Sequence, residues 1–152
     1  VAMNAEIVLS GLKGKRTVSA NDFYLGLFET DIMPDEMIIG INYPCLKTNE
    51  YIVFDEVCRR HGDYAMAGLI ARVELQNNNI KELKLVFFAT GDRPDIAHET
   101  AKIIINEGYD YLLTKKSLNS ELEFAGDLNS SPEMKLHLAT ILINKALKKL
   151  EK

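Results

Sequence analysis

One short stretch of the sequence, RRHGDYAMAGLIARV at residues 59–73, places charged and aromatic groups directly before an apolar run. Arg59 and Arg60 supply fixed positive charge and forked hydrogen-bond donors. Gly62 permits a sharp turn, or a close approach of the backbone to a ligand. This is the part of the chain whose residue types are best suited to holding a ligand.

The two residues that follow this glycine add an acceptor and a flat surface. Asp63 can accept hydrogen bonds from ring N–H groups or hold one of the arginines in place. Tyr64 offers an aromatic face with one polar tip. A strand-to-strand corner of this composition suits a planar, partly anionic heterocycle, and the alternative is a salt-bridged turn between two strands.

Other groups that could do chemistry are isolated in the sequence. His61, His98 and His137 do not follow metal-ligand spacing. The sequence contains no GxSxG, HExxH or GxxxxGK motif, and no GxGxxG follows a strand. The acid pairs Asp35-Glu36 and Asp55-Glu56 could serve as a general acid and base, but adjacent acids in turns and strands are usually solvated.

Composition restricts the class of protein. The chain has 152 residues with 47% hydrophobic and 26% charged side chains, a formal net charge of -4 and a pI of about 5.4. An acidic chain argues against a nucleic-acid or anionic-membrane surface, and the apolar runs fall short of the roughly 20 residues that cross a bilayer. Cys45 and Cys58 have no ligand-like spacing, so we expect two free thiols in the cytoplasm. The opening VAMNAEIVLSG reads as a strand in progress, which predicts a fragment or half of a split subunit.

The first 48 residues predict an incomplete lobe. A strand at residues 6–9 precedes a turn containing Gly11 and Gly14. A short helix follows within residues 16–32, with Ser19 or Asn21 as its N-cap, and then a strand at residues 37–43. Such a lobe is too small to be stable by itself.

Three strands are expected next, at residues 51–57, 65–75 and 80–90. The QNNN segment between the last two predicts an antiparallel hairpin. Alternation of apolar and charged residues along these two strands indicates that one face of the sheet is buried and the other is wet.

The rest of the chain predicts three helices. The first begins at Pro94 and Asp95 and ends at Gly108, with a shared apolar face made by Ala97, Ala101, Ile104 and Ile105. A weaker helix is expected at residues 117–124. In the last helix Ser130 and Glu133 satisfy the capping-box pattern. We expect its apolar stripe to consist of Met134, Leu138, Ile141 and Leu142.

These elements predict an α+β fold with a three-stranded antiparallel sheet packed with a three-helix bundle, preceded by a partial α/β lobe. We place the end of the first lobe at residues 1–48 and the second domain at residues 49–152.

The stretch RRHGDYAMAGLIARV resembles the motif RRxGDYAxAxxAxxV of the FAD-binding medium subunits of molybdenum hydroxylases, the family of aerobic carbon monoxide dehydrogenase and xanthine dehydrogenase. The upstream segment RTVSANDFYLGLFETDIMPDEMIIGINYP and the tail SPEMKLHLATILINKAL are similar to further segments of that family. Gly91 sits at the place of a glycine-containing loop. The ordered motifs extend over most of the chain.

The resemblance implies the C-terminal part of a flavoprotein subunit that passes electrons from 2Fe-2S clusters through FAD to an acceptor. A large subunit with a molybdenum–pterin cofactor and a small iron–sulfur subunit would be its partners, together with the missing N-terminal FAD-binding half. Carried over by position, Tyr64 would contact the isoalloxazine ring and Asp63 would lie beside it. Arg59, Arg60 and Gly62 would set the charge and shape of the loop.

Two departures from the family pattern affect this expectation. The glycine-rich AGGT-like and TIGG-like segments that bind the FAD diphosphate do not occur here, so the chain alone should hold FAD weakly or not at all. Relatives often have lysine at the place of Asp55 or Glu56. The alternative function is a non-catalytic assembly module that keeps the fold and has lost FAD.

Overall fold

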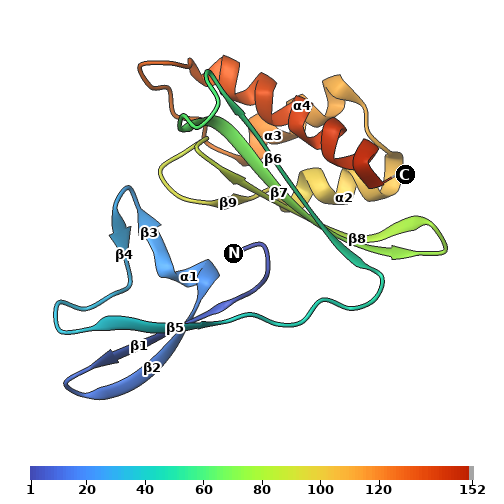
Figure 1. The fold of residues 1–152 in the computed structure, drawn as a ribbon. Helices are drawn as coiled ribbons and strands as arrows, with labels where there is room; N and C mark the ends of the chain where they lie inside the picture. Colours follow the sequence, from blue (N-terminus) through green and yellow to red (C-terminus); the bar gives the residue numbers. More distant parts are fainter. Residues whose placement is uncertain (151–152) are drawn as a thin grey trace.

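The computed structural model describes residues 1–150, which form two antiparallel sheets, a short hairpin and four helices (Figure 1). The smaller sheet has the strand order β2-β1-β5 and the larger sheet the order β6-β7-β8-β9, while β3 and β4 form the separate hairpin. The strands are β1 (Glu6–Gly11), β2 (Gly14–Ser19), β3 (Tyr24–Gly26), β4 (Glu29–Thr30), β5 (Met37–Asn42), β6 (Glu50–Cys58), β7 (Ala65–Gln76), β8 (Asn79–Phe88) and β9 (Asp95–Ile96).

The larger sheet confirms the three predicted strands and adds a fourth. The tip of the β7–β8 hairpin consists of Asn77 and Asn78, both with positive φ, which is the geometry of a two-residue type I′ turn. The predicted hairpin at QNNN is therefore confirmed. The residues Asp95–Ile96, expected to start a helix, instead pair with β8 as the edge strand β9.

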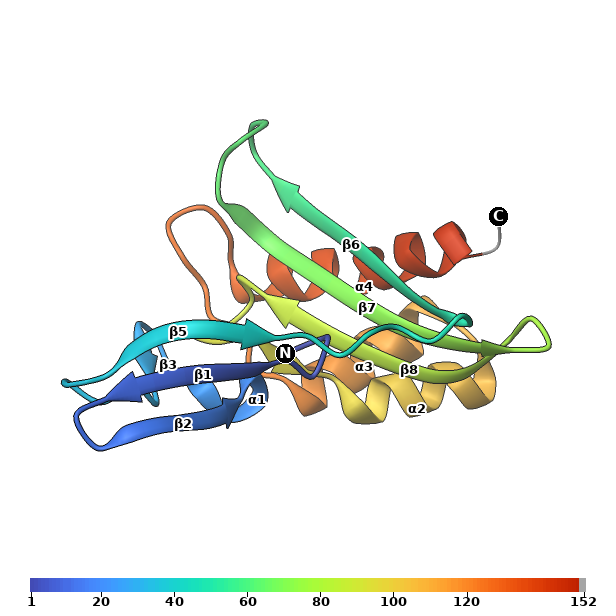
Figure 2. The same cartoon turned by 60° about the horizontal axis from the view of Figure 1, so that its bottom comes forward.

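The helices are α1 (Ala20–Phe23), α2 (His98–Glu107), α3 (Tyr111–Glu121) and α4 (Pro132–Leu150). The three longer helices cover one face of the larger sheet (Figures 1 and 2). Side chains from that face and from these helices form the main core. This arrangement confirms the predicted α+β architecture. None of the helices within residues 1–150 is long and apolar enough to span a bilayer.

Helix ends are fixed by caps, several of which differ from the prediction. Gly108 ends α2 with φ of 80°, as expected. The α3 helix begins at Tyr111 and not at residue 117, because the Asp110 side chain accepts a hydrogen bond from the Leu113 N–H. At α4 the capping side chain is Ser131, whose Oγ accepts from the Met134 N–H at 3.2 Å, and not Ser130.

The apolar stripe predicted for α4 is correct at Leu142 and wrong by about one position at its other three residues. Met134 is half-exposed, and Leu138 and Ile141 are only partly buried. The buried apolar residues of α4 are Leu136, Ala139, Leu142, Ile143 and Ala146. Because these positions recur every three or four residues, they lie on one helix face against β6 and β7.

The first 48 residues contain the short helix that was predicted within residues 16–32. Ser19 is the N-cap of α1, as one of the two expected positions, but the helix has only four residues. The segment on either side of it forms β2 and the β3–β4 hairpin. The buried core cluster of this part consists of Ala5, Ile7, Leu9, Ala20 and Phe23.

The sheet face opposite the helices carries a charged network. Glu50 and Glu74 lie in the polar phase of their strands but are buried, because cations cover them. Arg72 Nη2 lies 2.8 Å from Glu50 Oε1, and Glu74 accepts from Lys47 Nζ at 2.8 Å and Lys81 Nζ at 2.7 Å. Hydrogen bonds from the two lysines lower the pKa of Glu74 from 4.5 to about 2. The network fixes the segment before β6 to the sheet.

The same face holds the start of the chain. Lys84 Nζ donates to the Val1 carbonyl oxygen at 2.8 Å and also contacts Asn4 Oδ1. Burial lowers the pKa of Lys84. The smaller sheet therefore begins beside the uncovered face of the larger one (Figure 2).

Candidate functional site

The corner between β6 and β7, residues 59–64, contains the predicted site residues (Figure 1). Its backbone is ordered by Asp63, whose N–H donates to the Arg60 carbonyl oxygen at 3.1 Å. The Asp63 carboxylate accepts from the Tyr64 N–H at 2.9 Å and lies 3.7 Å from Arg59 Nη2. Of the two roles considered for Asp63, the structure therefore shows the one that holds an arginine.

The outer side of this corner is open. Tyr64 is 96% exposed. Gly62 has φ of 84°, and a Cβ added to it would meet no atom within 4 Å. The positive φ makes a glycine necessary for backbone reasons, and this side of the loop faces open space.

Asp55 and Glu56, which stand where relatives often have lysine, do not pair with the arginines of the corner. Asp55 Oδ2 lies 3.0 Å from Lys149 Nζ of α4, because its side chain points to the helical side of the sheet. The Glu56 carboxylate lies 3.7 Å from Cys58 Sγ. Burial, together with Glu56 and Asp63, raises the pKa of the Cys58 thiol. The thiol at the base of the corner is thus kept protonated.

The second acid pair is also structural. Glu36 Oε1 lies 2.6 Å from Arg16 Nε, and this guanidinium lowers the pKa of Glu36 to about 2. A carboxylate that stays ionised and paired is poorly suited to general acid–base catalysis. Within residues 1–150 no group of three or more His, Cys, Asp and Glu side chains is placed to hold a metal ion.

An aromatic pair on the uncovered face of the larger sheet was not found from the sequence. The rings of Phe54 and Phe88 are stacked, with centroids 5.8 Å apart and an angle of 16° between their planes. They lie on the uncovered face, and the Phe88 ring lies directly over Gly68. Apolar and polar residues alternate along both strands, and each phenylalanine stands at a position that this pattern assigns to a polar residue. This was the signal in the sequence from which the pair could have been found. The pair adds aromatic surface to the uncovered face of the sheet, between the charged network and the corner.

The loop containing Gly91 is held in place by a buried lysine. Lys135 is 5% exposed, and its Nζ donates to the Ala89 carbonyl oxygen at 2.7 Å and lies 2.8 Å from Asp127 Oδ2. A Cβ added to Gly26 would lie 3.6 Å from Asp92 Oδ2. The β3–β4 hairpin is therefore a neighbour of this loop.

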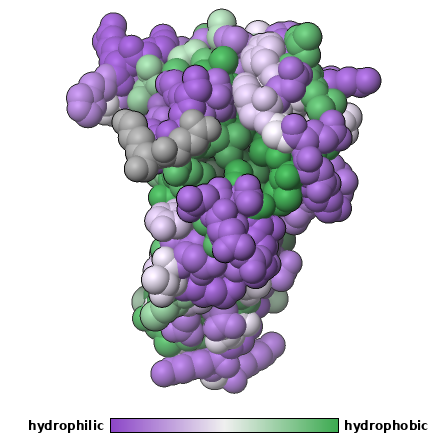
Figure 3. Space-filling view, turned by 90° about the vertical axis from the view of Figure 1, so that its right-hand side faces the viewer, coloured by the Kyte–Doolittle hydropathy of each residue, from purple (hydrophilic) through white to green (hydrophobic). Residues whose placement is uncertain are grey.

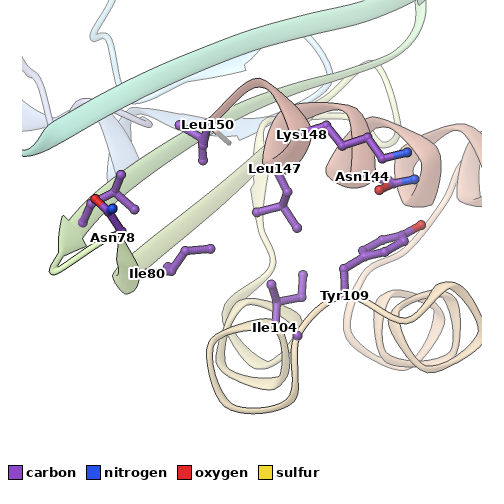
Figure 4. A pocket seen from close by; sticks show the side chains of 10 residues that line it. Asn78, Ile80, Ile104, Tyr109, Asn144, Leu147, Lys148 and Leu150 are labelled. Atoms are coloured by element: carbon purple, nitrogen blue, oxygen red, sulfur yellow. The ribbon is translucent and has the colours of Figure 1, made fainter. Parts of the chain in front are cut away.

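A cavity of about 690 Å³ lies at the far end of β7, away from the corner. Figure 3 shows apolar surface in a hollow at this end of the molecule, and Figure 4 shows Ile80, Ile104 and Leu147 around it. Tyr109 also lines it, but its hydroxyl already donates to the Thr140 carbonyl oxygen. At about 3.3 Å per residue along β7, the cavity is roughly 35 Å from Tyr64. It is not part of the corner.

Sequence comparison supplies relatives over nearly the whole chain. The glyceraldehyde dehydrogenase medium chain of Sulfolobus acidocaldarius is 33% identical over 97% of this chain and 53% of that protein. The carbon monoxide dehydrogenase medium chain of Afipia carboxidovorans is 23% identical over 97% of this chain and 52% of that protein. The chain spans about half the length of the curated relatives that it matches.

Solved structures show the same fold. Reconstituted CO dehydrogenase from Oligotropha carboxidovorans matches with a TM-score of 0.87 and 22% identity, over 99% of this chain and 54% of that one. The family model described as the CO dehydrogenase flavoprotein C-terminal domain matches residues 52–150. The chain belongs to the family of CO dehydrogenase flavoprotein C-terminal domains, in the medium subunits of molybdenum hydroxylases.

Proposed function

We propose that this chain is part of a flavoprotein subunit of a molybdenum hydroxylase and that its β6–β7 corner lies against the isoalloxazine ring of FAD. The observation that carries the proposal is the nearly complete exposure of Tyr64 on a loop that internal hydrogen bonds hold in place. An exposed aromatic side chain on an ordered loop is a surface for stacking on a planar ligand.

The residues of the corner fit the ring of FAD but not its diphosphate. The open side of Gly62, the face of Tyr64 and the cationic groups of Arg59 and Arg60 suit a flat group that carries negative charge. The glycine-rich diphosphate-binding segments of the family do not occur in this sequence. We therefore propose that residues 1–48 end a FAD-binding lobe whose remainder binds the diphosphate, and that residues 49–152 form the C-terminal domain.

FAD supplies the redox chemistry when it is bound, and the side chains of the corner would adjust its environment. Fixed positive charge from Arg59 and Arg60 stabilises negative charge on a nearby ring. Asp63 holds Arg59 and the Tyr64 N–H, so it sets the orientation of both groups. Electrons would pass from the molybdenum–pterin cofactor of a large subunit to the 2Fe-2S clusters of a small subunit, and from these clusters to FAD. The whole complex would lie in the cytoplasm.

The proposal is tested by adding the missing half of the subunit. The chain is mixed with FAD and with the part of the Sulfolobus acidocaldarius medium chain that it does not match, and unbound FAD is removed. We expect flavin absorbance to remain with the protein and flavin fluorescence to be quenched. A complex that stays colourless would contradict the proposal and favour a non-catalytic assembly module.

A variant of the corner then tests the ring contact itself. In the coloured complex, Tyr64→Ala should change the flavin spectrum and slow the reduction of an acceptor, because the stacking face is lost. Tyr51→Ala is the matched control, since Tyr51 is also exposed and lies on β6 near its other end. Equal spectra and rates for wild type and Tyr64→Ala would refute the contact.

A further inference from the structure

The cavity of about 690 Å³ at the far end of β7 has apolar walls that come from three elements of the chain. Leu75 and Ile80 are paired directly across β7 and β8, so their side chains share one face of the hairpin, and both line the cavity. Ile104 of α2 and Leu147 of α4 supply the facing walls (Figure 4). Cavities of about 300–1,000 Å³ with mostly apolar walls and a few polar groups are the usual binding sites for small molecules.

One side of this cavity carries the polar ends of Asn144, Lys148 and Tyr109 (Figure 4). Asn144 and Lys148 are four residues apart on α4, so their side chains are neighbours on the helix surface. In Figure 4 the Lys148 side chain runs toward Asn144, whereas Ile80 and Leu150 lie at the other side of the cavity. The cavity is therefore divided into an apolar part and a polar part.

The polar groups that α4 presents to the cavity are suited to an anion. Lys149, the next residue along the helix, is paired with Asp55, but within residues 1–150 neither the Lys148 ammonium group nor the Asn144 amide has a side-chain partner. The residues that line the cavity include no aspartate or glutamate. A cation and an amide donor side by side match a carboxylate, because its oxygens can accept a hydrogen bond from each.

We propose that this cavity binds a small amphipathic carboxylate, with its hydrocarbon part between the β7–β8 hairpin and α2 and its carboxylate at Asn144 and Lys148. All the lining residues lie within residues 52–150, the segment that the family model matches. The site is separate from the β6–β7 corner, so the inference does not rest on the proposed function. A ligand held there would connect the hairpin with α2 and α4, and it would stabilise the folded domain by binding to it.

Decanoate and decanol, which have the same chain length and differ in charge, test the inference on the complete chain. Both are added below the concentrations at which they aggregate. In methyl NMR spectra, decanoate should shift the signals of Ile80, Ile104 and Leu147 with a one-to-one stoichiometry. The signals of Leu128, which is exposed in the loop before α4, should stay unchanged. Decanol should bind at least about fivefold more weakly, because it lacks the charge that Lys148 attracts.

Two lysine variants separate the ionic contact from non-specific binding. Lys148→Gln should weaken the binding of decanoate by about fivefold or more and leave the binding of decanol unchanged. Lys145→Gln is the matched control, because Lys145 is exposed on the same helix but does not line the cavity, and this variant should bind decanoate like wild type. Three results would overturn the inference: no shift of the lining methyl signals, equal binding of decanoate and decanol, or equal weakening by the two variants.

Discussion

Gly68 lies under the ring of Phe88 in β7, and replacing it with alanine should disturb the stacked pair of Phe54 and Phe88. A Cβ at this position would lie well under 3.0 Å from three ring carbons of Phe88. Real Cβ atoms do not approach other atoms so closely, so the ring must move. Because the ring is stacked on Phe54, its displacement also breaks that contact.

The expected cost combines two contributions. Overpacking that forces a side chain out of its place costs about 1–3 kcal/mol. The lost aromatic pair contributes about 0.5–1.5 kcal/mol. We therefore expect Gly68→Ala to lower the free energy of unfolding by about 2–4 kcal/mol.

Urea unfolding of a small set of variants measures this cost. Gly40→Ala is the matched control, because a Cβ at Gly40 in β5 would meet no atom within 4 Å, and it should be neutral or stabilising by up to about 1 kcal/mol. In a Phe88→Ala background the obstructing ring is absent, so Gly68→Ala should cost less than about 1 kcal/mol. The reasoning is refuted if Gly68→Ala behaves like Gly40→Ala, or if its cost is unchanged in the Phe88→Ala background.

Two further predictions concern ionisable groups. Lys47 and Lys81 lower the pKa of Glu74 to about 2, so the contribution of Glu74 to stability is present above its ordinary pKa of 4.5 and is lost as the pH falls toward 2. The difference in unfolding free energy between wild type and Glu74→Gln should therefore shrink over this range. A constant difference would contradict the assignment. Burial and neighbouring acids raise the pKa of Cys58, whereas Cys45 is exposed, so mass spectrometry should show slower alkylation of Cys58. Equal alkylation rates would contradict the placement of Cys58.

Local sequence signals predicted much of the larger sheet. Alternating residues gave the buried faces of β7 and β8, where Val73, Leu83 and Leu85 are buried as expected. The Asn-Asn turn followed from a backbone requirement that is satisfied within four residues. Features that depend only on residues close together in the sequence could therefore be predicted.

Features that depend on tertiary contacts could not be predicted from the sequence. Asp95–Ile96 forms a strand because β8 offers a free edge. The proline before these residues gives no indication of this pairing. The start of α2 is capped by another helix, since Glu121 of α3 accepts from the N–H groups of Glu99 and Thr100 at 2.7 and 3.0 Å. The sequence does not show which of the two adjacent serines caps α4. The choice of Ser131 over Ser130 depends on the local orientation of the backbone.

The sequence predicted the corner between β6 and β7 but not the aromatic pair on the same sheet. Residues 59–64 are contiguous, so a hairpin corner brings them together without any long-range pairing. The Phe54–Phe88 pair requires the register in which Gly68 lies opposite both Phe88 and Glu56. A shift by one residue would place the rings on the other face of the sheet, and this register was not determined by the sequence pattern.

The central claim is that the corner lies flat against the flavin, and the flavin fluorescence lifetime in the reconstituted subunit tests it most directly. A tyrosine in contact with the ring should quench the fluorescence, so Tyr64→Leu should lengthen the lifetime while Tyr51→Leu leaves it unchanged. The account predicts this difference between the two variants. The same short lifetime in wild type and Tyr64→Leu would contradict it.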